Sequence, residues 1–285
     1  MAPIVSRPMS NPRLGVGFMI LAMALVPMID VIAKMLAEDG MPPIQVAFQR
    51  MLCGVILFLP IILYKEPKAI LPKGNFKQAF MLGFCNFGAT AFFFTALKYL
   101  SIADTVAISF VQPLFVTLLS RFFLKEDVSS GRWIALFVGF IATLIIIRPS
   151  SSAFEPASLL ALASGACMAL YVISVKSKGT YIPPIQKTFY THSMALLTAL
   201  PIIIWVWEPV SLEQWGYSFM LAAVGLIGQF LPDTADASLI APLAYTEMVT
   251  STLASWWFFK QLPDAITFLG VTILIGAALA ISWKA

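Results

Sequence analysis

Five ionisable side chains lie inside long apolar stretches of this sequence, where charge is costly. Asp30 and Lys34 are four residues apart, so a helix would place them on one face, where they can pair or form an outer gate. Arg50 could bind a substrate anion or pair with Asp30, and Glu247 could carry a proton or meet a cationic group. His192 could contact a proton or a substrate. Each of these groups could instead serve only to hold neighbouring helices together.

Amide and aromatic side chains in the same stretches form a second group of candidates for contact with a solute. Consecutive residues of a helix point about 100° apart, so Phe92, Phe93 and Phe94 cannot all face one site. Rings that share a stretch with the polar residues are the better candidates. Amides inside apolar helices are equally common as packing contacts. The candidates are Gln112, Gln229, Tyr171, Tyr190, Tyr245 and Trp256.

Patterns typical of enzymes, metal sites and nucleotide sites are missing from the sequence. His192 is the only histidine, and Cys53, Cys85 and Cys167 lie in apolar stretches at no metal-like spacing. Neither GxSxG nor GxxxxGK[ST] occurs. The net charge of +4 is small and spread over several loops. We therefore expect a protein that is not an enzyme, with no cofactor, no metal and no nucleic-acid partner.

The composition predicts a membrane protein. Hydrophobic residues make up 60% of the 285 residues and charged residues 11%, against about 25% charged in soluble domains. A mean hydropathy of +0.89 leaves too little polar surface to cover a water-soluble globule. Many apolar stretches approach the roughly 20 residues that span a bilayer as a helix. We expect an all-α polytopic membrane protein surrounded by the lipid bilayer.

Charges, prolines and small polar residues separate about ten apolar segments. The residues before them, with Arg7 and Arg13, are expected to form a cytoplasmic tail and not a signal peptide. Transmembrane helices are expected at 14–36, 44–64, 76–97, 102–123, 132–148, 156–177, 187–207, 214–231, 237–259 and 263–283.

The basic residues predict the orientation of these helices. With the first residues in the cytoplasm, the cytoplasmic side carries thirteen of the eighteen Lys and Arg residues and the opposite side carries three. The remaining two, Lys34 and Arg50, lie within helices. We expect a multi-pass protein of the cell inner membrane with both termini in the cytoplasm.

The chain contains an internal repeat. PPIQVAFQRMLCGVILFLPIIL, from Pro42, and PPIQKTFYTHSMALLTALPIII, from Pro183, share 9 of 22 positions. Proline is favoured at a helix start, where its missing N–H has no partner to lose, so PPIQ opens the second and the seventh helix. Five helices is an odd number, so the second copy is inverted. We predict two repeats, residues 1–150 and 151–285, which is a common construction of secondary transporters.

The end of each half carries a pattern typical of a known family. Pro–Leu–Phe, an acidic residue after the helix and a glycine-bearing last helix occur in FVQPLFVTLLSRFFLKEDVSSGRWIALFVGFIATLIII. The counterpart is DASLIAPLAYTEMVTSTLASWWFFKQLPDAITFLGVTILIGAAL. Over nearly its whole length the chain resembles EamA-type carriers of the drug/metabolite transporter superfamily. DVIAK, VAFQR and AYTEMV resemble the branch that includes the riboflavin and S-adenosylmethionine uptake carriers of proteobacteria. GQFLPDTADASLIAP joins the eighth and ninth helices about one turn more tightly than that resemblance implies.

The resemblance implies a secondary transporter for a small organic metabolite. Uptake of riboflavin or a similar heteroaromatic vitamin is the first expectation. The alternatives are uptake or exchange of S-adenosylmethionine, export of amino acids or drugs, and a membrane scaffold or sensor that does not transport. A homodimer is compatible with the sequence.

Overall fold

The computed structural model describes residues 12–67, 70, 76–125, 130–147, 155–176, 182–230 and 237–283. It gives the backbone alone for 12–24, 130, 132, 135, 136, 228–230, 237–246, 248, 274 and 277–283. Every regular element of this part of the chain is a helix. Their ends agree with the ten expected segments to within about three residues. The elements are α1 (Pro12–Glu38), α2 (Pro43–Lys65), α3 (Phe76–Leu97), α4 (Ile102–Ser109), α5 (Gln112–Leu119), the π-helix η2 (Ser120–Leu124), α6 (Ser130–Ile147), α7 (Ser158–Lys176), α8 (Pro184–Val206), α9 (Leu212–Phe230), α10 (Ala237–Phe259) and α11 (Ala265–Trp283).

The helical segment expected at 102–123 spans Ile102–Leu124 and is divided into α4, α5 and η2. Pro113 has no N–H, so the Ser109 carbonyl loses its bonding partner four residues ahead. The backbone turns more tightly just before the proline, where the Val111 N–H donates to the Ile108 carbonyl at 3.2 Å. The break therefore follows from a single proline about half-way along the segment.

The lengths and surfaces of the helices suit a bilayer. Within the described residues, five helical segments are long and apolar enough to span it: α2, α3, the broken run from α4 to η2, α7 and α8. Large apolar side chains on their outer faces stay exposed, for example Trp205 at 86% and Ile204 at 74% of their surface. A soluble protein would bury such a surface, whereas lipid accepts it.

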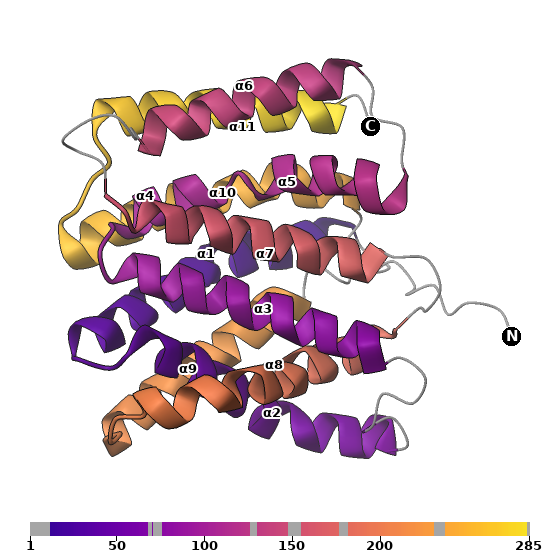
Figure 1. Ribbon diagram of the computed structural model, residues 1–285, viewed down its shortest axis with the longest axis vertical. Helices are drawn as coiled ribbons and strands as arrows, with labels where there is room; N and C mark the ends of the chain where they lie inside the picture. Colours follow the sequence, from indigo (N-terminus) through magenta and orange to yellow (C-terminus); the bar gives the residue numbers. More distant parts are fainter. Residues whose placement is uncertain are drawn as a thin grey trace, which may run out of the picture.

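The two halves interlock about an approximate two-fold relation. α3 packs on α7 and α8 of the second half. In the same way α9, the counterpart of α3, packs on α1 and α2 of the first half. α1 packs on α10, just as α7 packs on α4 and α5. α6 and α11 lie together at one edge of the molecule, and α2 and α8 lie together near the opposite edge (Figure 1). The fold is thus two inverted five-helix repeats, while the exact division at residue 150 stays a prediction.

Gly83 permits the close approach of α3 to α8. A Cβ atom at this position would lie 2.4 Å from Met194 Cβ and 2.5 Å from the Ala195 nitrogen. Backbone atoms of a packed helix cannot move aside cheaply, and small residues let membrane helices approach closely.

We expect Gly83→Ala to destabilise the purified protein by about 1–3 kcal/mol, because the added methyl group forces α3 away from α8. Gly216→Ala on α9 is the matched control, since a Cβ there meets nothing within 4 Å. The measurement is the temperature at which the detergent-solubilised protein loses its monodisperse size-exclusion peak. Equal transition temperatures for the two variants would contradict the expectation.

Candidate functional site

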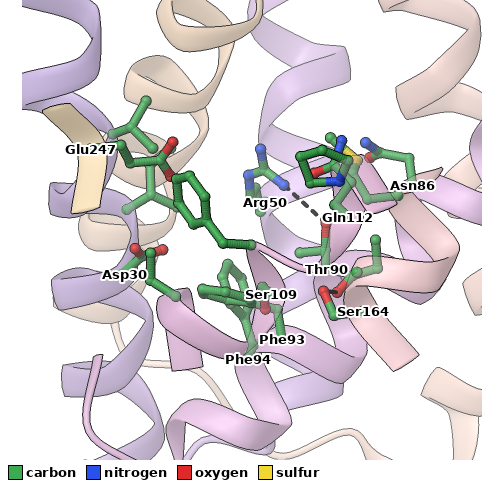
Figure 2. Close-up of a pocket in the computed structure, with 18 residues that line it drawn as sticks. Asp30, Arg50, Asn86, Thr90, Phe93, Phe94, Ser109, Gln112, Ser164 and Glu247 are labelled. Atoms are coloured by element: carbon green, nitrogen blue, oxygen red, sulfur yellow. Dashed lines mark hydrogen bonds between the residues drawn. The ribbon is translucent and has the colours of Figure 1, made fainter. Parts of the chain in front are cut away.

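A cavity of about 370 Å³ lies between helices of both halves (Figure 2). This volume is within the usual range for small-molecule sites. Four of the predicted site residues line it together: Asp30 from α1, Arg50 from α2, Gln112 from α5 and Glu247 from α10. The other lining residues are Val26, Ile29, Asn86, Ala89, Thr90, Phe93, Phe94, Val106, Ser109, Phe110, Pro113, Ser164, Gly165 and Met168.

The Arg50 guanidinium is held by two residues that the sequence reasoning did not select. Its Nη1 donates a hydrogen bond to Thr90 Oγ1 at 3.1 Å (Figure 2). Gly225 of α9 leaves room for it, because a Cβ there would lie 3.0 Å from Nη2 and 3.1 Å from Nε. Arg50 Nε is buried near Gly225 and has no hydrogen-bond partner among the described residues. A guanidinium group that lines a cavity is suited to bind an anionic group.

Two carboxyl groups face the same cavity. Asp30 is 5% exposed, and its Oδ2 atom has no hydrogen-bond partner among the described side chains. Asp30 lies within electrostatic range of both Glu247 and Arg50. Leaving a buried carboxyl oxygen unpaired costs free energy, which a cation or a proton would recover. The cavity therefore combines one basic group with two acidic groups.

Phenylalanines supply the apolar wall of the cavity. Phe93 and Phe94 of α3 line it together with Phe110 at the α4–α5 break, while Phe92 is directed outward and is 38% exposed. Phe93 and Phe94 are in edge contact, with ring centroids 6.4 Å apart. Flat ring systems can stack on such a wall.

The break between α4 and α5 lies at the cavity. Ser109, Phe110, Gln112 and Pro113 all line it. Gly165 of α7 lets the break come close, since a Cβ there would lie 3.1 Å from the Ser109 carbonyl oxygen. Phe110 and Val111 keep right-handed helical backbone angles, so the break is a tight turn between two helices that lines the cavity.

Pairing with Asp30 was one of the alternatives considered for Lys34, whose contacts in the structure lie elsewhere. Its Nζ donates to the Leu100 carbonyl at 2.6 Å and to Gln261 Oε1 at 3.4 Å, and it lies 5.3 Å from the centre of the Phe259 ring. These contacts tie the end of α1 to the α3–α4 turn and to the α10–α11 connection. The long side chain reaches a free carbonyl near the helix ends, so Lys34 is outside the cavity.

The tyrosine and tryptophan candidates are also outside the cavity. Tyr171 is buried against Leu82 and Cys85, and Tyr190 lies in a buried cluster with Phe58. Trp256 is 45% exposed, with Lys260 Nζ 5.6 Å from its ring centre. Sharing a helix with a polar residue does not place a ring on the same face. The side chains of Gln229 and Tyr245 lie outside the described residues, as does the 231–236 connection that was expected to be short.

His192 is a buried packing residue next to the site. Its Nδ1–H donates to the Thr188 carbonyl at 2.9 Å, one turn back on α8. Its ring lies against Gly54 of α2, where a Cβ would approach Cδ2 to 2.5 Å. It lies within electrostatic range of Arg50 without lining the cavity.

The polar side chains that α3 and α7 contribute to the cavity, among them Thr90 and Ser164, were not predicted from the sequence. Thr90 holds Arg50, and Ser164 Oγ donates to the Ala89 carbonyl at 2.8 Å, which joins α7 to α3. Small hydroxyl residues are common in membrane helices and gave no signal. Asn86, whose Oδ1 is buried without a partner, was visible as an amide in an apolar stretch but was not selected.

Comparisons with known proteins agree with this architecture. The EamA-like transporter family matches twice, at residues 13–148 and 156–283. The S-adenosylmethionine uptake transporter of Rickettsia bellii is 28% identical over 95% of this chain and 94% of its own. The riboflavin transporter of Brucella anthropi is 26% identical over 85% and 88%, and the pseudopaline exporter of Pseudomonas aeruginosa PAO1 is 26% identical over 86% and 88%.

A solved crystal structure shares the fold, with a TM-score of 0.63 and 19% identity over 95% of this chain and 96% of that one. The two family matches cover both five-helix halves and leave out little beyond the ends and the connection between them. The chain therefore belongs to the EamA-like transporter family, as a multi-pass membrane protein built from two copies of the family's repeat.

Proposed function

We propose that this transporter is a secondary carrier for a small organic solute that bears both cationic groups and a carboxylate, with S-adenosylmethionine as the representative substrate. The observation that supports this is the opposition of Arg50 to Asp30 and Glu247 within one cavity. We further propose that it lies in the cell inner membrane with both termini in the cytoplasm, as the distribution of basic residues predicts.

The charges of S-adenosylmethionine complement those of the cavity. The solute has a sulfonium and an ammonium group for the two carboxyl groups, and a carboxylate for the guanidinium of Arg50. Its adenine ring is flat and can stack on Phe93 or Phe94. Charges that meet opposite charges in a site of low dielectric give both affinity and discrimination. The Rickettsia bellii relative is named as an S-adenosylmethionine uptake transporter, which supports the same substrate for this chain.

Riboflavin, the first expectation from the sequence, becomes the second candidate. The phenylalanine wall and the Brucella anthropi riboflavin transporter favour it. A neutral flavin, however, would leave the three charged groups of the cavity to compensate one another. One relative is named as a pseudopaline exporter, so outward movement of the solute is the alternative direction.

Labelled S-adenosylmethionine and labelled riboflavin distinguish these candidates. We expect bacterial cells that express the chain to accumulate S-adenosylmethionine saturably, above an empty-vector control, and to ignore riboflavin. Accumulation of riboflavin alone would overturn the proposed substrate. The lumen of an inverted vesicle corresponds to the outer side of the membrane. Accumulation of labelled S-adenosylmethionine inside such vesicles would therefore reverse the direction while keeping the substrate.

Replacing Glu247 by Gln removes one of the two carboxyl groups without changing its size. We expect uptake of S-adenosylmethionine to fall at least about tenfold, because truncating one partner of a buried charge pair costs about 2–5 kcal/mol. Glu38→Gln at the exposed end of α1 is the control and should transport normally. Membrane content is measured by immunoblot. Wild-type uptake in Glu247→Gln would exclude a role for this carboxyl group.

Thr90 tests whether the orientation of Arg50 sets the affinity for the carboxylate. Thr90→Val keeps the shape and loses the acceptor, so we expect KM for S-adenosylmethionine to rise about three- to tenfold. Thr90→Ser keeps a hydroxyl group, so its KM for S-adenosylmethionine should equal that of the wild type. KM for decarboxylated S-adenosylmethionine should change less than about twofold in either variant. An equal rise for both solutes would show a general packing defect.

A further inference from the structure

The repeated PPIQ segment has a partner in each repeat, a Glu–Pro pair that follows the same helix. Glu66–Pro67 follows α2 and Glu208–Pro209 follows α8. α2 and α8 lie together and run in opposite directions, so the start of each faces the end of the other (Figure 1). In the structure the glutamine of each PPIQ bonds to the glutamate of the other repeat.

The contact at the start of α2 consists of two hydrogen bonds to the backbone. Gln45 Nε2 donates to the Glu208 carbonyl at 2.8 Å, and the Glu208 N–H donates to Gln45 Oε1 at 2.8 Å. Gln45 is fully buried. Two further bonds join the halves at this end: Gln49 Oε1 accepts from Ser218 Oγ at 2.6 Å, and Gln214 Nε2 donates to Asp39 Oδ2 at 2.7 Å.

The contact at the start of α8 involves a side-chain carboxyl group and is more open to water, although Phe58 of α2 and Tyr190 of α8 share a buried cluster nearby. Gln186 Nε2 donates a single hydrogen bond to Glu66 Oε2 at 2.6 Å, and both side chains are partly exposed. A bond between two water-accessible side chains can be exchanged for water, whereas a buried amide that loses both its partners cannot be satisfied.

The prolines explain why these glutamines reach across the interface. A Gln at the third position of a helix normally turns back to bond the N–H of the N-cap residue. Here the N-cap residues are Pro42 and Pro183, which have no N–H. Gln45 and Gln186 therefore have no partner on their own helix ends and can bond the opposite repeat.

We propose that these two contacts are unequal clamps of the α2–α8 pair, which carries Arg50 into the cavity. The clamp formed by Gln45 and Glu208 stays closed throughout the transport cycle and acts as the fulcrum. The clamp formed by Gln186 and Glu66 opens and closes, so the two helices separate only at that end. This inference concerns the movement of the proposed carrier and does not depend on its substrate.

Matched cysteine pairs can lock each end without removing the clamp residues. Ile44→Cys with Pro209→Cys flanks the first clamp, and Ile185→Cys with Pro67→Cys flanks the second. Both pairs are placed in a background whose native cysteines are replaced by alanine, and they are joined by a short, reducible bis-methanethiosulfonate reagent. The readout is uptake of S-adenosylmethionine into proteoliposomes before and after reduction.

A second readout is independent of the substrate. In a separate set of proteins, Ser109→Cys is added to each cysteine pair, and this third thiol is protected while the cross-link forms. After deprotection, its rate of reaction with a polar maleimide in detergent reports the accessibility of the cavity. We expect the cross-link at Ile185 and Pro67 to lower both uptake and labelling at least tenfold, reversibly on reduction. The cross-link at Ile44 and Pro209 should change neither by more than twofold.

Inhibition by both cross-links, by neither, or only by the one at Ile44 and Pro209 would overturn the proposal. If the uncrosslinked protein does not take up S-adenosylmethionine, the proposed substrate fails. The labelling rates then still decide whether the two ends of the α2–α8 pair differ.

Discussion

The constraint on which this structure depends is the cost of charge inside a bilayer. A charged side chain at that depth is tolerated where it faces a cavity or an opposite charge. Asp30, Arg50 and Glu247 come from three helices and line the same cavity. Arg50 and Glu247 both lie within electrostatic range of Asp30. The surrounding helices are close-packed through glycines and small hydroxyl residues, so polar groups collect in the centre and the outside stays apolar.

The inverted repeat is what brings these charges together. Asp30 and Arg50 belong to the first half and lie within electrostatic range of each other, while the second half contributes Glu247 to the same cavity. The exchange of contacts, with α3 on the second half and α9 on the first, makes the cavity a product of their association. A solute in the cavity would therefore touch both halves at once, which is the geometry that alternating access requires.

Most of the architecture could be predicted from the sequence, and about half of the site could not. The number of helices could be predicted from the long apolar segments. The inversion could be predicted from the PPIQ repeat and the odd number of helices in each half. Asp30, Arg50, Gln112 and Glu247 stood out because polar groups are rare in such segments. The face on which a ring or a lysine lies depends on neighbouring helices, so the sequence could not show that Tyr171, Tyr190, Trp256 and Lys34 do not line this cavity. Thr90 and Gly225 became visible only when α3 and α9 were seen beside Arg50.

The helix break at Pro113 is a structural difference between the two halves. α10, the counterpart of α4 and α5, continues as one helix through Pro242. Two identical inverted halves would make the inward-open and outward-open forms mirror each other and hold equal free energy. A break in one half removes the structural basis for that equality, so the free energies of the two forms are not fixed by the repeat.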